Sequence, residues 1–63
     1  MKKDIVTIIC YGEKKQMERR DAIALYLEAM MCCEGFEKIR YTNIYLDLIT
    51  GKKVCSDLEK GVD

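Results

Sequence analysis

The sequence predicts a small α+β domain in which an antiparallel sheet of two to three strands carries a two-helix hairpin on one face, in the order ββααβ. Three patterns predict it: a β-branched run at residues 4–11, helix-forming runs at residues 19–34 and 37–50, and glycines between them. The chain has 63 residues, room for one domain. We expect this domain to span residues 1–57, with residues 58–63 as a frayed C-terminal tail.

The first predicted strand reads DIVTIICY, residues 4–11. Its alternate side chains are largely apolar on both faces, so we expect a strand that is central or covered on both sides. Gly12 suits a tight hairpin turn, after which the short basic segment 14–17 would return as a protected edge strand. The alternative leaves residues 14–18 as a loop or early helix and gives the order βααβ.

Two helices follow, over residues 19–34 and 37–50. The first is apolar almost all round, which predicts burial on more than one side. Gly35 and Gly51 are each expected one position beyond a helix end, where glycine is preferred. The second helix has one main apolar face, formed by Tyr41, Ile44, Tyr45 and Leu48.

The last predicted element is a short strand, KKVCS at residues 52–56, with Val54 facing the core. A strand without neighbours would leave its backbone hydrogen bonds unmade. We therefore expect it to return beside the first hairpin.

Composition narrows the functional classes. Eleven basic and eleven acidic residues give no formal net charge, which argues against a protein built around nucleic-acid affinity but permits a local basic patch. The chain has no histidine, the commonest general base and metal ligand, and so short a chain has little material for a deep pocket. We therefore predict a protein that is not an enzyme, with no catalytic residues, cofactor or metal.

Neither a signal peptide nor a membrane span is predicted. The apolar run after Lys2 and Lys3 covers only residues 5–10, too short for a signal core. The longest largely apolar stretch, residues 22–33, is shorter than the roughly 20 residues that span a bilayer. We expect a cytoplasmic chain without a membrane partner.

Four cysteines show no CxxC spacing: Cys10, Cys32, Cys33 and Cys55. We expect them to be reduced and to act as small apolar residues. A zinc site built from Cys10, Cys55 and one of the adjacent pair, or a set of disulfides, are the alternatives.

Basic residues gather in two segments, and six of them are candidate contacts for nucleic acid or an acidic partner: Lys14, Lys15, Arg19, Arg20, Lys52 and Lys53. Arginines at a helix start interact unfavourably with the helix dipole, and a broken local rule can mark function. Neutralisation by Glu18 and Asp21 is the favoured explanation. A phosphate-binding patch and an acidic protein partner are the alternatives.

Apolar residues outside the predicted core form a second candidate surface: Met31, Ile39 and Leu46. They would be either the margin of the core or the interface of a homodimer or protein partner. Tyr26, Tyr41 and Tyr45 suggest a base-stacking platform, but their places on the facing helix sides favour core packing.

The segment Tyr41–Tyr45 with Leu48, Gly51 and residues 55–57, together with Ala22, Tyr26, residues 28–30 and the break at residues 33–35, carries a resemblance. Over residues 11–57 the chain resembles short uncharacterised proteins of Gram-positive gut bacteria, which we associate with conjugative elements and prophages. The resemblance implies a setting on mobile DNA and no activity or site residues.

These observations lead to one main expectation, a small cytosolic protein-interaction module that binds a protein partner or a second copy. The resemblance suggests an accessory or regulatory factor of a mobile element. The alternative is a nucleic-acid-binding module that uses Lys14, Lys15, Arg19 and Arg20.

Overall fold

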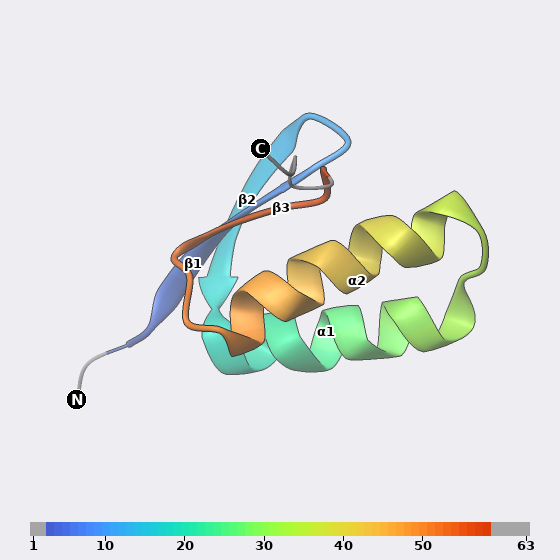
Figure 1. The fold of residues 1–63 in the computed structure, drawn as a ribbon. Helices are drawn as coiled ribbons and strands as arrows, with labels where there is room; N and C mark the ends of the chain where they lie inside the picture. The colour runs from blue at the N-terminus through green and yellow to red at the C-terminus, as the bar shows by residue number, and fades with distance from the viewer. Residues whose placement is uncertain (1–2, 59–63) are drawn as a thin grey trace.

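A computed structural model describes residues 3–58 and confirms the α+β class and the order ββααβ (Figure 1). Its elements are β1 Ile5–Cys10, β2 Glu13–Glu18, α1 Arg19–Cys32, α2 Phe36–Ile49 and β3 Val54–Ser56. Of the expected C-terminal tail, residues 59–63 lie outside the described residues. Neither helix within residues 3–58 is long and apolar enough to cross a membrane.

The hairpin of β1 and β2 forms as predicted, so residues 14–18 are neither loop nor helix. The strands pair from Ile5 opposite Glu18 to Cys10 opposite Glu13. Tyr11 and Gly12 connect them with positive φ angles of 53° and 81°. Positive φ at both central residues is the pattern of a type I′ turn, whose twist matches that of the strands.

The sheet has the order β2-β1-β3 and is mixed, whereas an antiparallel sheet was predicted. β3 runs parallel to β1, with Thr7 opposite Val54 and Ile9 opposite Ser56. The cause is the helical hairpin: α1 leaves from the end of β2, and α2 returns beside it to the end of the sheet where β1 begins (Figure 1). A strand that starts there and lies beside β1 must run in the same direction.

Only one face of the sheet is covered. Val6, Ile8 and Cys55 are fully buried on the helix side, whereas Ile5 and Val54, on the other side, are 41% and 54% exposed. β1 is central as predicted, but it is not covered on both faces. The prediction that Val54 faces the core is wrong, because the pairing with β1 sets Cys55 beside the buried Ile8.

The helices complete the core with four buried residues, Ala22, Tyr26, Ile44 and Leu48. The rings of Tyr26 and Tyr41 meet at 5.8 Å between centroids and 47° between planes, so these tyrosines pack inside the helical hairpin. α1 was predicted to be buried on more than one side. Its outer side is instead open, with Leu27 37% and Met31 75% exposed.

The two glycines at the helix ends play different roles. Gly51 lies one position beyond the C-cap of α2, as predicted. Its N–H donates to the Leu48 carbonyl and the Lys52 N–H donates to the Asp47 carbonyl, which is the Schellman pattern. Gly35 does not follow α1 in this way. α1 already ends at its C-cap Cys33, and Gly35, with φ 74° and ψ −142°, is the N-cap of α2.

Candidate functional site

Asp57, just after β3, is a buried carboxylate with only 3% of its surface exposed. Its Oδ2 accepts hydrogen bonds from the Tyr11 N–H at 2.9 Å and from the Arg40 guanidinium at 3.0 Å. Its backbone N–H donates to the Ile9 carbonyl at 3.0 Å, and its own carbonyl accepts from the Asn43 side chain at 3.4 Å. Asp57 therefore ties the hairpin turn, the sheet and α2 together.

Tyr11 occupies a conformation that is unfavourable for a residue with a side chain, at φ 53°. Three contacts hold it there: the Asp57 bond to its N–H, the Arg40 guanidinium 4.9 Å from its ring centroid, and the Glu37 carboxylate 3.3 Å from its hydroxyl. Desolvation and the negative charge of Glu37 raise the pKa of the Tyr11 hydroxyl. A tyrosine hydroxyl is protonated at neutral pH even without this rise, so it donates to Glu37. Backbone strain of this kind persists only where the surroundings enforce it.

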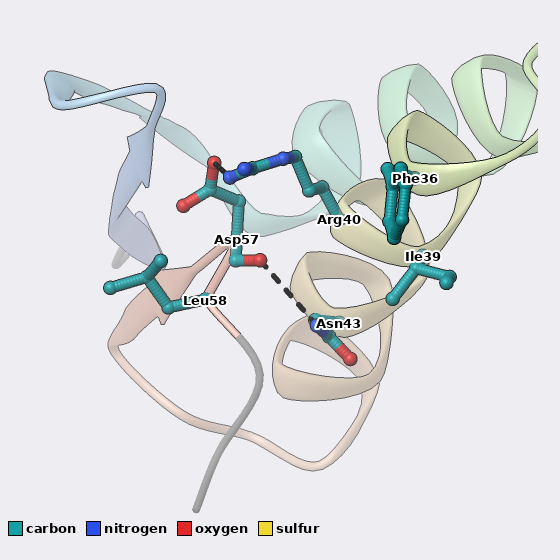
Figure 2. Close-up of a pocket in the computed structure, with 6 residues that line it drawn as sticks. All are labelled: Phe36, Ile39, Arg40, Asn43, Asp57 and Leu58. Atoms are coloured by element: carbon teal, nitrogen blue, oxygen red, sulfur yellow. Dashed lines mark hydrogen bonds and ion pairs between the residues drawn. The ribbon is translucent and has the colours of Figure 1, made fainter.

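Beside this network lies a small surface hollow of about 140 Å³ (Figure 2). Its polar side is the hydrogen-bonded set Arg40, Asn43 and Asp57, while its apolar rim is exposed: Phe36 83%, Leu58 65% and Ile39 49%. Pockets for small-molecule ligands usually measure about 300–1,000 Å³. The hollow is below that range, and it has the dimensions for one or two side chains of another chain.

Another exposed apolar side chain lies further along α2, beyond Asn43 of this hollow. Ile39 and Leu46, both 49% exposed, are seven residues apart and so share one side of the helix. We call the set Phe36, Ile39, Leu46 and Leu58 the Phe36 strip. Met31 is 75% exposed as well, but it lies on α1, and the structure does not bring it into the hollow.

Two members of the Phe36 strip, Phe36 and Leu58, and the whole Asp57 network were missed by the sequence analysis. Phe36 was missed because the second helix was expected to begin one residue later. The spacing of Phe36 and Ile39 at i and i+3 on a helix was the signal that could have identified it. Nothing in the sequence pattern pointed to Asp57, since its bond to Tyr11 joins residues 46 positions apart.

The six predicted basic contacts do not form one patch. Lys14 and Lys15 are adjacent on a strand and project from opposite faces of the sheet. Arg19 is largely enclosed: it forms an ion pair with Asp4 and donates to the Leu48 carbonyl at 2.6 Å. Arg20, beside it, is exposed.

The predicted neutralisation of the arginines at this helix start is wrong for Arg19. Its charge is balanced by Asp4, where Glu18 and Asp21 had been expected to neutralise it. It also lies at the C-terminal end of α2, where a cation interacts favourably with the helix dipole. The guanidinium, with a smaller contribution from Lys53, holds the pKa of Asp4 below its usual range.

Lys52 and Lys53 precede β3, on the far side of β1 from β2. They are therefore separated from Lys14 and Lys15 on β2 by the central strand β1. The Lys52 ammonium pairs with the buried Asp47 at 3.3 Å. Lys53 lines an open hollow at the start of β1, where it meets Lys3, Asp4 and Arg19.

The four cysteines are free thiols. Burial raises the pKa of the Cys10 thiol, and the neighbouring Asp57 carboxylate raises it further, so this thiol is protonated at neutral pH. Among residues 3–58, no three Cys, Asp or Glu side chains are grouped closely enough to hold a metal ion.

The fold and these surfaces define a class of small ββααβ domain with a mixed three-stranded sheet and one open sheet face. Comparison of the chain with protein-family models, with curated proteins and with solved structures finds no match in any of the three.

Proposed function

We propose that this protein is a non-enzymatic protein-interaction module that binds a protein partner through the Phe36 strip. The observation that carries the proposal is Phe36, the chain's single phenylalanine, 83% exposed at the rim of a hollow whose polar side is already hydrogen-bonded. Aromatic side chains dominate the energetics of protein interfaces. An exposed aromatic next to other apolar side chains is typical of such a surface.

The polar side of the hollow supports a binding role. Arg40, Asn43 and Asp57 already bond to one another or to the backbone, so their geometry is fixed before any partner arrives. Preorganised surfaces lose less conformational entropy on binding. The occupant that fits is a protein segment that presents one or two aliphatic or aromatic side chains to the hollow.

The described residues offer little for catalysis. The Cys10 thiol is held protonated beside Asp57, and histidine is absent from the chain. The resemblance to short proteins of Gram-positive gut bacteria supports a finer proposal, a cytoplasmic accessory or regulatory factor encoded on a mobile element.

A capture experiment with matched variants tests this proposal. The tagged protein is incubated with lysate of a Gram-positive gut bacterium, with and without nuclease, and bound proteins are identified by mass spectrometry. We expect a discrete protein that survives nuclease, is lost with Phe36→Ser and is retained with Met31→Ser. Met31 is the control because it is apolar, 75% exposed and outside the Phe36 strip. Equal capture by both variants would contradict the proposal.

A second candidate function rests on the basic hollow of Lys3, Arg19 and Lys53, with Asp4 among them. This second function is nucleic-acid binding, in which Lys3 and Lys53 at the hollow would contact phosphates of the DNA or RNA. Binding to a DNA or RNA oligonucleotide should then weaken steeply with salt, and Lys3→Ala/Lys53→Ala should reduce the slope. Lys14→Ala/Lys15→Ala, at the other end of β2, is the control. The absence of oligonucleotide binding at low salt would contradict this second function.

A further inference from the structure

The outer edge of β2 is open to a further strand, because β2 lies at the side of the sheet. The Arg19 N–H donates to the Asp4 carbonyl at 2.7 Å, one position beyond the Ile5–Glu18 pair that ends the β1–β2 ladder, so this next position has the geometry of a hydrogen-bonded pair. Hydrogen-bonded and non-hydrogen-bonded pairs alternate along an antiparallel ladder. The backbone groups that point away from β1 therefore belong to alternate residues, Lys14, Gln16 and Glu18. Of these groups, the Glu18 carbonyl belongs to the N-cap of α1 and accepts within that helix, so Glu18 offers its N–H to a further strand.

These three positions determine how a second copy can pair with the edge. An antiparallel β2 strand must bring its own outward-pointing residues against the same three. The overlap is greatest when Gln16 lies opposite Gln16 of the second copy. In that register Lys14 lies opposite Glu18 of the second copy, and Glu18 lies opposite its Lys14.

The charges agree with the register that the backbone selects. Lys14, Gln16 and Glu18 share one face of β2, opposite Ile9, Thr7 and Ile5 on the open side of the sheet. Directly opposite side chains in an antiparallel pair are close enough to form ion pairs. Charged residues ordinarily protect an edge strand from pairing. Here Lys14 and Glu18 carry opposite charges at equal distances from Gln16, so the strand is complementary to an antiparallel copy of itself. A register shifted by two residues would instead place Lys14 or Glu18 opposite Gln16.

An exposed apolar residue lies beneath the same edge. Leu25 of α1 is 49% exposed and lines a hollow with Glu13 and Lys15 of β2. A second copy joined to β2 would bring its own α1 to this side of the sheet, and the apolar surface of Leu25 would be covered.

We infer that two copies of this chain associate through antiparallel pairing of their β2 strands, with Gln16 at the two-fold axis and Lys14–Glu18 ion pairs on either side. The result is a continuous sheet in the order β3-β1-β2-β2-β1-β3. The pairing uses a different surface from the Phe36 strip, so the test of the dimer and the test of the proposed function are independent of each other.

The test is the molar mass in solution, measured by light scattering and sedimentation between about 10 μM and 1 mM in low salt. We expect a concentration-dependent dimer. Lys14→Glu and Glu18→Lys should each give a monomer, because each sets like charges opposite one another at both ends of the pair. The double variant Lys14→Glu/Glu18→Lys should dimerise again, and an equimolar mixture of the two single variants should form heterodimers.

A backbone variant tests the strand pairing separately from the charges. Gln16→Pro removes an N–H that points away from β1, so the hairpin keeps its ladder while the central intermolecular bonds are lost. Gln16→Ala is the matched control and should still dimerise. Far-UV circular dichroism reports whether each variant is folded. A monomeric wild type at 1 mM, a dimer that survives Gln16→Pro, or charge variants that fail to restore one another would each overturn the inference.

Discussion

At the scale of single residues, Asp57 shows how one buried carboxylate can organise a small domain. Burying a carboxylate is costly unless it is paired and hydrogen-bonded. Arg40 and the Tyr11 N–H meet both conditions on the same oxygen. The unfavourable backbone of Tyr11 and the shape of the hollow therefore depend on one side chain that follows the last strand.

Replacing Asp57 with Asn should lower the free energy of unfolding by about 1.5 kcal/mol, because a hydrogen-bonded charge is lost. Arg40 is 37% exposed, so solvent screening limits the loss. Urea unfolding of Asp57→Asn, Arg40→Gln and the double variant measures the coupling. If the two single losses simply add, the pair does not stabilise the fold as described.

Asp4 gives a prediction for pH. Its partner Arg19 lowers the pKa of Asp4 in the folded protein below the ordinary value of 3.8. The folded state then binds the proton less tightly than the unfolded state, so the stabilisation is present above the ordinary value and is lost as pH falls through the folded value. Asp4→Asn should remove this part of the acid dependence of stability. Urea unfolding between pH 2 and pH 6 tests it, with Asp21→Asn, an exposed carboxylate on α1, as the control.

At the scale of elements, Arg19 joins three of them, since it begins α1, pairs with Asp4 before β1 and donates to the last turn of α2. Arg19→Ala should cost about 2 kcal/mol of unfolding free energy, the usual range for a hydrogen bond to a charged group. Arg20→Ala should change it by less than about 0.5 kcal/mol, because Arg20 is exposed on the surface. Thermal and urea unfolding of the two variants distinguish them, and equal losses would contradict the assigned role of Arg19.

The elements themselves were predictable from local patterns. The β-branched run at residues 4–11, the helix-forming runs and Gly51 each act within a few residues, and each placed its element or helix end correctly. Gly35 was placed at the wrong helix end because a glycine between two helices can serve either of them. The Asp57 network was not predictable, since its partners come from β1, the turn and α2, and only the folded chain brings them together.

At the scale of the whole molecule, direction and coverage were the features that sequence patterns did not determine. The pattern KKVCS predicts a strand but carries no information on whether it runs parallel to β1. The return of the helical hairpin decides that direction, and the register then decides that Cys55 is buried while Val54 is exposed. Because both helices pack on the same face of the sheet, the other face is open, and Ile5 on that face is exposed.

A small core makes the stability of the whole molecule sensitive to single substitutions. A domain of 63 residues is expected to have an unfolding free energy of about 3–9 kcal/mol. Ile44 is fully buried between the helices and the sheet, and Ile44→Ala should cost about 3 kcal/mol through lost burial and the cavity left behind. The domain should then be close to half unfolded at 37 °C if its stability lies at the lower end of that range.

The matched control is Leu46→Ala on the same helix, two residues away and 49% exposed, which should cost less than about 1 kcal/mol. Urea unfolding followed by far-UV circular dichroism gives both values from the same measurement. A large difference between the two variants places the core on the Ile44 side of α2 and leaves Leu46 free for the Phe36 strip. Similar losses would mean that Leu46 is covered in solution, which is the outcome expected only if a second molecule already occupies the strip.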